Sequence, residues 1–307
     1  MNFTDNLAAL VYFKGKVHKW KNIALLFGVL SFLLIFKMLF GLDVSNGVIE
    51  GSHIASIKID GVIFNDEYRN KILDNLANDN NVKAVIVNID SPGGEIVGSE
   101  ILYNNLREIA KKKPIGVLMY SSAASGAYMA SIASDYIVAH NGTLTGSIGV
   151  LMESPEFTDL ASKIGVKFNT YKSSPLKGSP SPFEKSNQQV ERVIKDSIDD
   201  SYRFFVQLVE ERRGKLINRK FQNEVFDGRV FTGRQAVNAG LVDKIGSQND
   251  ILEYFKAKKI DVEDLPIREV EIVKKDKKFL ENFVGKLPFL NPESKIANQH
   301  KIMAILP

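Results

Sequence analysis

A small-residue run in the middle of the chain places a serine where nucleophilic chemistry is feasible. Residues 115–119 are apolar, as in a strand; the small-residue run 121–127 follows; and residues 128–133 have the pattern of a helix. A serine at such a turn exposes its hydroxyl at the end of a sheet, and the backbone N–H groups beyond it point to the same place. Ser125, followed by Gly126, is therefore the candidate nucleophile. A tightly packed helix start without a catalytic role is the alternative interpretation.

A serine hydroxyl is a weak nucleophile, so Ser125 needs a general base beside it. Histidine is the usual base, and the chain has four. His18 and His300 lie in the terminal segments, and His53 lies at the start of the main body. His140 lies at the end of a predicted strand, where a surface or loop-packing role suits it better than catalysis. The sequence therefore gives only weak support to a Ser-His-Asp triad.

A lysine can replace histidine when burial favours the neutral amine over the ammonium ion. Residues 166–183 form a Ser-, Pro- and Gly-rich loop that holds Lys172 and Lys177 and few other charges. Either lysine could act as the base of Ser125. Both could equally be solvated loop residues, because most lysines in proteins are exposed.

The elements that must position these residues alternate between strands and helices. The apolar run at 82–89 is nearly continuous, which is typical of a strand covered on both faces in a parallel sheet. The pattern predicts an α/β fold. The predicted strands cover 54–63, 82–89, 115–119 and 135–140. The predicted helices cover 68–77, 97–113 and 186–213, and a short helix is expected between an N-cap at Thr232 and a C-cap at Gly240.

Composition excludes several classes of function. The net charge is +4 over 307 residues, and no basic stripe with interleaved aromatics occurs, which argues against a nucleic-acid partner. The chain has no cysteine, which excludes disulfides, a thiol nucleophile and thiolate metal sites. We expect neither a metal nor a cofactor.

An apolar segment near the N-terminus has the length of a membrane-spanning helix. Residues 23–42 hold one charge, Lys37, close to the far end of the segment. Four lysines precede the segment and acidic residues follow it, so the positive-inside rule places the first part in the cytoplasm. A cleaved signal peptide is less well supported, because no clear small-x-small site follows. A buried core helix is the remaining alternative.

Five short motifs follow one another along the main body. They are DSPGG at 90–94, ASGAY at 124–128, GTLTGSIG at 142–149, the lysine loop up to SPF at 181–183, and DGRVFTG at 227–233 with AGLVD at 239–243. Their types and order resemble the signal peptide peptidase A family of membrane-anchored bacterial serine proteases. The resemblance covers roughly residues 52 to 255. It implies a ClpP/crotonase-like α/β domain with repeated β-β-α units, preceded here by one transmembrane helix.

The resemblance also implies roles for individual residues. The family uses a Ser-Lys dyad, in which the second lysine of the loop is the base; this points to Lys177 and leaves Lys172 as the non-catalytic lysine. Ser147 matches a serine that orients the lysine amine, and a simple turn residue is the alternative. The backbone N–H groups of Gly93, Gly94 and Gly126 would form the oxyanion hole. The loop departs from the family at Ser174, Pro175, Leu176 and Gly178.

The function implied is hydrolysis of remnant signal peptides and other membrane-derived or unfolded peptides by an oligomer at the bacterial inner membrane, with the catalytic domain outside the cytoplasm. Whether the lysine of the dyad comes from the same copy as the serine or from a second copy is left open by the sequence. The alternatives are a related membrane protease aimed at one partner protein, a crotonase-like acyl-thioester enzyme, and a catalytically idle scaffold. The expected divisions are a cytoplasmic segment at 1–22, a transmembrane helix at 23–42, a peptidase domain at 52–255 and a C-terminal extension at 256–307.

Overall fold

The computed structural model describes residues 20–21, 25, 27–29, 31–32, 51–272 and 303–305. The chain divides into two compact units, Met1–Gly51 and Ser52–Pro307. Most of the predicted span at 23–42 lies outside the described residues, and the six described there are helical. Among the residues that can be assessed, no helix combines the length and the apolar character needed to cross a membrane.

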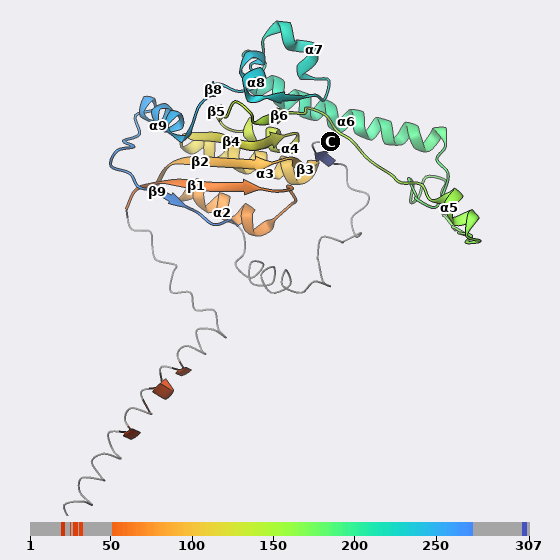
Figure 1. The fold of residues 1–307 in the computed structure, drawn as a ribbon, viewed down its shortest axis with the longest axis horizontal. Coiled ribbons are helices and arrows are strands. Elements are labelled where there is room, and N and C mark those ends of the chain that lie inside the picture. The colour runs from red at the N-terminus through yellow and green to blue at the C-terminus, as the bar shows by residue number, and fades with distance from the viewer. Residues whose placement is uncertain are drawn as a thin grey trace, which may run out of the picture. The chain divides into compact units, whose positions relative to one another are not determined.

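The second unit is built on an eight-stranded sheet, which confirms the predicted α/β class (Figure 1). The order along its main path is β7-β6-β4-β2-β1-β9, with β5 beside β4 and β8 beside β5. Every pairing is parallel except that of β6 with β7. The strands are β1 (His53–Asp60), β2 (Val82–Ser91), β4 (Ile115–Ala124), β5 (Tyr136–Ala139), β6 (Leu144–Gly146), β7 (Val230–Thr232), β8 (Lys244–Ile245) and β9 (Ile267–Glu269).

A second, two-stranded sheet joins β3 (Gly93–Glu95) to β10 (Met303–Ile305). The helices are α2 (Glu67–Asn78), α3 (Ile96–Lys112), α4 (Gly126–Ser131), α5 (Thr158–Lys163), α6 (Gln188–Arg213), α7 (Gln222–Val225), α8 (Gly233–Ala239) and α9 (Gln248–Ala257), with a 3₁₀ turn at Arg219–Phe221. The runs β2-β3-α3 and β5-β6-α5 follow the predicted β-β-α order.

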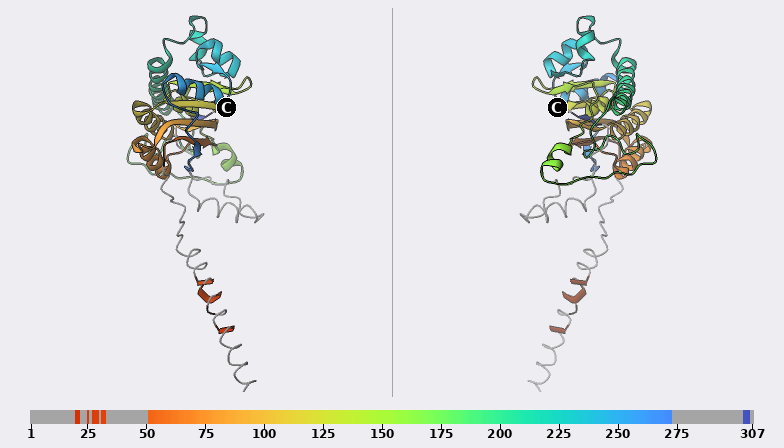
Figure 2. Two further views of the ribbon diagram at one scale, coloured as in Figure 1. Left: turned by 90° about the vertical axis from the view of Figure 1, so that its left-hand side faces the viewer. Right: turned by 90° about the vertical axis from the view of Figure 1, so that its right-hand side faces the viewer.

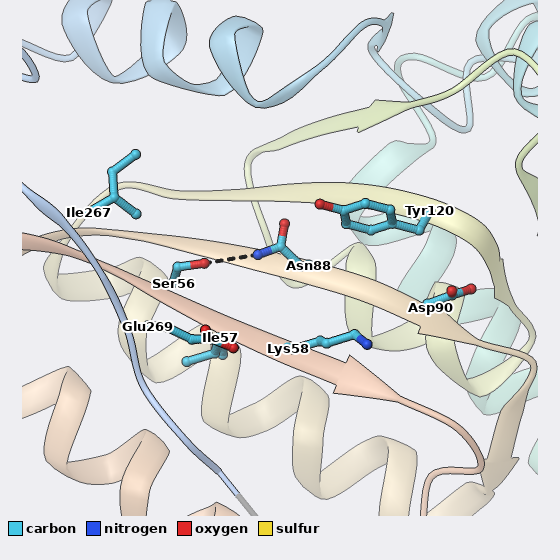
Figure 3. Close-up of a pocket in the computed structure, with 8 residues that line it drawn as sticks. All are labelled: Ser56, Ile57, Lys58, Asn88, Asp90, Tyr120, Ile267 and Glu269. Atoms are coloured by element: carbon cyan, nitrogen blue, oxygen red, sulfur yellow. Dashed lines mark hydrogen bonds between the residues drawn. The ribbon is translucent and has the colours of Figure 1, made fainter.

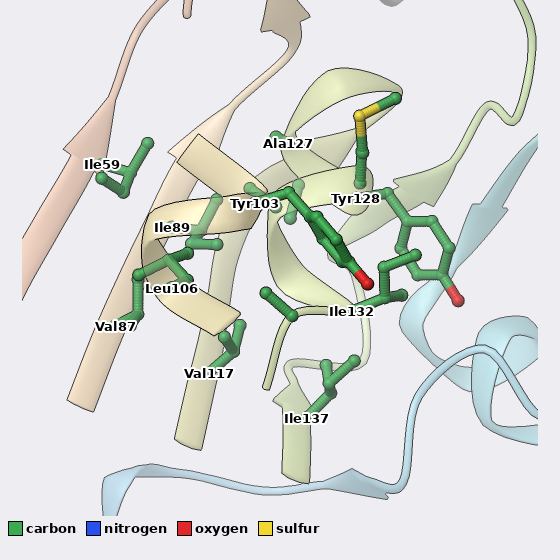
Figure 4. Close-up of a cluster of buried hydrophobic side chains, with 14 of the residues drawn as sticks. Ile59, Val87, Ile89, Tyr103, Leu106, Val117, Ala127, Tyr128, Ile132 and Ile137 are labelled. Atoms are coloured by element: carbon green, nitrogen blue, oxygen red, sulfur yellow. The ribbon is translucent and has the colours of Figure 1, made fainter. Parts of the chain in front are cut away.

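The main core lies on one face of the large sheet. Alternate residues of a strand point to opposite faces, so Ile57 and Ile59 of β1 enter this core together. Figure 4 shows Val87 and Val117 of neighbouring strands facing Leu106 of α3. In the views of Figure 2 the orange and tan helices α2 and α3 lie on the same side of the strands. This layer holds the elements on both sides of Ser125 in place.

A smaller core lies on the other face. Ile54, Ile86 and Leu118 pack there against Ile251 and Phe255 of α9. This apolar contact covers only part of the face. Farther along the same strands the residues turn polar, which leaves a polar hollow described below.

The region predicted as an extension after residue 255 contributes strands. β9 pairs in parallel with β1, and β10 pairs antiparallel with β3. Helix α9 ends at Ala257, two residues beyond the predicted end of the peptidase domain at residue 255. Sequence periodicity could not predict β9 or β10, because each is only three residues long and is defined by its pairing partner.

Candidate active site around Ser125

Ser125 stands between β4 and α4 in a conformation that few residues adopt. Its φ is 55° and its ψ is −122°, and a non-glycine residue in such a region carries local strain. Its N–H donates to the carbonyl oxygen of Gly146 at 2.8 Å, and its own carbonyl oxygen accepts from the N–H of Met129 at 2.9 Å. The backbone on both sides therefore holds the residue in this geometry.

The side chain of Ser125 is buried and unsatisfied. It is 1% exposed, and its Oγ has no hydrogen-bond partner among the described residues. An unsatisfied buried hydroxyl costs about 1–3 kcal/mol, and such groups call for an explanation. A strained backbone together with an unpaired hydroxyl is the arrangement expected of a nucleophile that awaits its base and substrate.

Three of the predicted glycines meet beside Ser125. A β-carbon on Gly126 would lie 3.2 Å from the nitrogen of Gly94, so β3 and the start of α4 are in contact. A β-carbon on Gly94 would lie 2.0 Å from the carbonyl oxygen of Ile63. Gly93 has a φ of 106°, which glycine adopts without a steric penalty. The close approaches explain glycine at positions 94 and 126, and the positive φ explains it at position 93.

The backbone hydrogen bonds of β3 show that the N–H groups of the predicted glycines are not equivalent. The N–H of Gly93 donates to Ser91 Oγ at 3.1 Å, so it already has a partner and does not serve as the predicted oxyanion donor in this geometry. Ile63 donates to the carbonyl of Gly93 at 2.8 Å and accepts from the N–H of Glu95 at 2.9 Å. Because successive residues of a strand face opposite edges, Gly94 presents its N–H away from Ile63. Of the three predicted donors, Gly94 and Gly126 are therefore the two whose N–H groups are not directed to Ser91 or Ile63, and the edge of β3 that carries Gly94 pairs with β10 in this structure.

Ser147 lies in the strand-end region next to Ser125. β6 pairs with the end of β4, with Gly146 opposite Ala124, and Ser147 is the next residue. It is buried, has a φ of 51°, and donates its N–H to the carbonyl of Arg229 at 2.8 Å. The structure thus brings Ser147 to the same end of the sheet as Ser125, and its role in orienting an amine stays a prediction.

The structure does not bring Lys177 to Ser125. Lys177 is exposed in the loop that follows α5, and its ammonium has no hydrogen-bond or ion-pair partner within the described parts of the chain. Figure 1 shows α5 beyond the end of α6, away from the sheet. The dyad of Ser125 and Lys177 is therefore not formed within the single copy described here, and the assignment of Lys177 as the base stays a prediction.

Lys172 is held by other groups. Its ammonium pairs with the Glu184 carboxylate and lies 3.4 Å from Ser179 Oγ. The hydrogen bond from Lys172 holds the pKa of Glu184 below its ordinary value. A lysine whose amine is held by a carboxylate in this way is a poor general base, so of the two loop lysines Lys177 is the one available.

His140 lies on the surface, as its position in the sequence suggested. It is exposed just after β5, and its ring meets the edge of the Tyr120 ring with centroids 5.8 Å apart. Its backbone N–H donates to Thr143 Oγ1 at 3.0 Å. Neither contact involves Ser125.

A polar hollow of about 440 Å³ lies elsewhere on the sheet, and Figure 3 shows its lining. Ser56, Lys58, Asn88, Asp90, Tyr120 and Glu269 provide its polar groups. None of the predicted site residues lines it. Within the described residues no group of three or more acidic or histidine side chains is placed to hold a metal ion.

Sequence reasoning missed Ser99, which belongs to the surroundings of the glycine pair. It lies in the first turn of α3, is fully buried, and its Oγ has no partner among the described residues. A β-carbon on Gly126 would come within 2.1 Å of that oxygen. The available signal was the small pair Gly98-Ser99 at a helix start, where a bulkier residue would be ordinary.

Curated relatives share the central part of the chain. It is 38% identical over 186 residues to "Putative protease MJ0651" of Methanocaldococcus jannaschii, covering 61% of this chain and 59% of the relative. It is 37% identical over 188 residues to "Putative signal peptide peptidase SppA" of Enterococcus faecium, covering 61% and 54%. It is 33% identical over 207 residues to "Protease 4" of Haemophilus influenzae, covering 64% and 33%. The chain thus spans between a third and three fifths of the length of these relatives.

Two solved structures, both of mutant proteins, are similar at low identity. The 1510-N membrane-bound stomatin-specific protease matches with a TM-score of 0.45 and 17% identity, covering 72% of this chain and 98% of that one. The ClpP1 protein from Listeria monocytogenes matches with a TM-score of 0.39 and 15% identity, covering 64% and 94%. The α/β class stated above rests on the strand order of this chain itself.

The part of the chain that matches a protein-family model includes both residues of the predicted dyad. The model described as "Peptidase family S49" matches residues 107–262, roughly half of the chain. The match includes Ser125, Ser147 and Lys177, and the glycines at 93 and 94 precede it. The predicted class, a serine-type peptidase, is therefore confirmed at the level of the family: this chain belongs to peptidase family S49.

Proposed function

We propose that this chain is a membrane-anchored serine endopeptidase with Ser125 as its nucleophile and Lys177 as its general base. One observation carries the proposal: Ser125 is held at a φ of 55°, and its buried hydroxyl, which has no hydrogen-bond partner among the residues that the structure describes, lies beside the contact between Gly94 and Gly126. A ClpP/crotonase-like arrangement of the domain fits the same placement.

The chemistry is acyl transfer. The neutral amine of Lys177 takes the proton of Ser125 Oγ, and Oγ bonds to the carbonyl carbon of the substrate peptide. Two backbone N–H groups, from Gly94 and Gly126, stabilise the negative oxygen that develops. The C–N bond then breaks as Lys177 returns the proton to the leaving amine. Water, deprotonated by Lys177, attacks the acyl-serine ester, which releases the carboxylic acid and restores Ser125.

A second copy of the chain supplies Lys177 in this proposal. The loop that holds it belongs to an arm, residues 151–183, with many exposed apolar side chains. They are Leu151, Phe157, Leu160, Ile164, Val166, Phe168, Tyr171 and Phe183. Apolar groups gathered on a surface are typical of an interaction site. Docking of this arm on a neighbouring copy would desolvate the amine and favour its neutral form beside Ser125. The resulting assembly would be a homo-oligomer.

The proposed substrates are remnant signal peptides and other membrane-derived or unfolded peptides, and the proposed location is the bacterial inner membrane with the catalytic unit outside the cytoplasm. The apolar segment at 23–42 and the lysines before it support the anchor and its direction. The relative named as a signal peptide peptidase supports the substrate class. A protease for one partner protein is the nearest alternative.

The test uses the full chain in detergent with a signal-peptide substrate. Ser125→Ala and Lys177→Ala are each expected to lower kcat by about 10³-fold or more, because nucleophile and base act as a unit. Lys172→Ala and His140→Ala are the controls and are expected to keep turnover. Activity retained in Ser125→Ala would overturn the proposal, and an assembled but inert wild type would favour the scaffold alternative.

An experiment that mixes two inactive variants tests whether Lys177 comes from the same copy as Ser125 or from a second copy. Inactive Ser125→Ala and Lys177→Ala chains, unfolded together and reassembled, are expected to regain about a quarter of wild-type activity, because random head-to-tail pairing leaves that share of sites with both residues. A mixture that stays inactive while each variant assembles would show that one copy supplies both residues.

A further inference from the structure

The loop at residues 61–66, which connects β1 to α2, supports the strand that carries Gly94 (Figure 1). Ile63 of this loop forms an isolated parallel bridge with Gly94. The N–H of Ile63 donates to the carbonyl of Gly93 at 2.8 Å, and its carbonyl accepts from the N–H of Glu95 at 2.9 Å. These two bonds hold β3 along one edge, so a displacement of the loop is transmitted to Gly94.

The same loop packs against the first turn of α3. A β-carbon on Gly98 would lie 2.8 Å from the nitrogen of Asn65 and 2.8 Å from the carbonyl carbon of Phe64. Real β-carbons do not approach backbone atoms so closely, so any larger residue at position 98 must displace the loop. The loop is therefore held between α3 on one side and its own bonds to β3 on the other.

Arg69 fixes the loop to the helix that follows it. Arg69 lies in the first turn of α2 and is 8% exposed, and its Nη2 donates to the carbonyl of Phe64 at 2.8 Å. The start of α2 is capped by another residue, because the Asp66 carboxylate accepts from the N–H groups of Tyr68 and Arg69 at 2.9 and 3.2 Å. The guanidinium is therefore not needed as a helix cap, and its one printed side-chain bond goes to the loop.

The burial of Arg69 is costly for the fold. A guanidinium stays charged in proteins, and buried charges are normally paired. Among the described residues Arg69 has no ion pair, and its buried Nε has no hydrogen-bond partner. Burial lowers the pKa of Arg69 from its ordinary value, with the Asp66 carboxylate acting in the opposite direction. An incompletely compensated buried charge of this kind calls for a functional explanation.

We infer that Arg69 is a positioning residue of the peptidase site, which holds the N–H of Gly94 in place through the loop at 61–66. Its bond to the Phe64 carbonyl keeps the neighbouring Ile63 in register with β3. The inference rests on the proposed function, since it assigns Arg69 to the oxyanion site of that reaction. Arg69 itself touches neither the substrate nor Ser125.

The loss of such a residue has a specific kinetic signature. The oxyanion develops only when Ser125 attacks the peptide carbonyl, so a misplaced N–H at Gly94 weakens the transition state more than the bound substrate. The predicted effect is a lower kcat with a nearly unchanged KM. A peptide aldehyde forms a tetrahedral adduct with a serine hydroxyl, so its binding should weaken in parallel. The corresponding peptide alcohol forms no adduct, and its binding should be unchanged.

The experiment compares Arg69→Met and Arg69→Lys in the full chain in detergent. Methionine fills similar space without a donor, whereas lysine keeps a charged donor for the Phe64 carbonyl. Arg69→Met is expected to lower kcat about 10- to 100-fold, with KM within about 2-fold of wild type. The Ki of the peptide aldehyde is expected to rise by the factor that kcat loses. Arg69→Lys is expected to retain more of kcat than Arg69→Met.

Gly98→Ala disturbs the same loop from the other side and leaves Arg69 in place. Alanine favours the helix over glycine, but its β-carbon must displace the backbone of Phe64 and Asn65. The same pattern is expected, a lower kcat and a weaker aldehyde with little change in KM. This variant keeps the inference testable even where the Arg69 variants fail to fold.

Lys113→Met is the matched control. Lys113 is also a partly buried cation bonded to backbone carbonyls, those of Leu76 at 2.7 Å and Asp79 at 2.8 Å, but it contacts the C-terminal end of α2. Its replacement is expected to lower the urea unfolding midpoint and to leave kcat and the aldehyde Ki of the folded protein unchanged.

Wild-type kcat and aldehyde Ki in both Arg69→Met and Gly98→Ala would overturn the inference. An activity loss that matches only the unfolded fraction of each variant, with the aldehyde Ki unchanged, would also overturn it and make Arg69 a purely structural residue. Failure of the proposed function looks different, because the wild type itself would then cleave no peptide and bind the aldehyde no more tightly than the alcohol.

Discussion

Ser99 of α3 and Gly126 of α4 are in direct contact: a β-carbon on Gly126 would lie 2.1 Å from Ser99 Oγ and 3.0 Å from its Cβ. The same β-carbon would lie 3.2 Å from the nitrogen of Gly94, so Ser99, Gly126 and Gly94 pack closely together. A small side chain at 99 therefore allows Gly126 and Gly94 to approach each other closely.

This contact predicts a rescue experiment. Gly126→Ala is expected to lower kcat by about 10²-fold or more, because the added methyl group displaces an N–H donor from the oxyanion position. Adding Ser99→Gly removes the obstructing hydroxyl and is expected to restore part of the lost kcat. Kinetics of the single and double variants on one peptide give the measurement. If the double variant is no better than Gly126→Ala, the contact does not limit the site.

Two substitutions of Ser147 can distinguish the role of its hydroxyl from the effect of its backbone conformation. Its φ of 51° favours glycine, so Ser147→Gly is expected to stabilise the fold by up to about 1 kcal/mol and Ser147→Ala is not. If the hydroxyl orients the lysine amine, both variants lose about 10- to 100-fold in kcat. Urea unfolding and kinetics together make the distinction, and full activity in both variants would reduce Ser147 to a turn residue.

The Arg213–Asp243 pair ties the end of α6 to the sheet. Arg213 Nη1 lies 2.8 Å from Asp243 Oδ1, and Asp243 Oδ2 accepts from the N–H of Ile137 at 2.7 Å. The side chains of Arg213 and Asp243 are only 6% and 18% exposed, so Arg213→Ala leaves a largely buried carboxylate without its ionic partner. The expected loss is about 3–5 kcal/mol in urea unfolding.

The exposed pair of Arg203 with Asp200, 4.0 Å apart, is the control for that prediction. Arg203→Ala is expected to cost less than about 1 kcal/mol, because water screens exposed ion pairs. Equal losses in the two arginine variants would show that burial does not set the difference.

The Lys172–Glu184 pair predicts a pH dependence of the arm. The pKa of Glu184 lies below its ordinary 4.5, so at pH values near and below 4.5 the unfolded chain binds more protons than the folded one. The stabilisation is complete above pH 4.5 and is lost as the pH falls through the lowered pKa. Thermal unfolding of wild type and Glu184→Gln should differ at pH 6, and the difference should shrink below pH 4.5.

Glu153→Gln is the matched control, since Glu153 is exposed and makes no contact with a basic side chain in the described part of the chain. Its unfolding midpoint is expected to follow the wild type across the same range. A Glu184→Gln difference that stays constant with pH would contradict the assignment.

Several elements were predictable from the sequence because local patterns define them. The apolar run at 82–89 appears within β2, and the predicted helix at 97–113 appears as α3, one residue earlier. Thr232 caps α8 and Gly240, with a φ of 83°, ends it. Each of these depends on neighbours within a few residues, which periodicity and capping rules read directly.

Other elements depend on distant partners. The small residues at 121–124 were expected to form a turn, yet they extend β4, because residues 122–124 pair with β6. Residue 63 was expected at the end of a strand and instead forms an isolated bridge to Gly94. No local pattern reports such pairings, since the partner lies tens of residues away.

By itself, the sequence determined the α/β class, the serine at a strand-to-helix junction, the glycines beside it and the peptidase family, because these follow from residue type and local order. Only the tertiary structure decided that the N–H of Gly93 bonds to Ser91, that among the described residues Lys172 has an ionic partner and Lys177 has none, and that residues 303–305 pair with β3. These relationships depend on which hydrogen-bond and ion-pair partners the folded chain brings together, and local sequence patterns do not specify those partners.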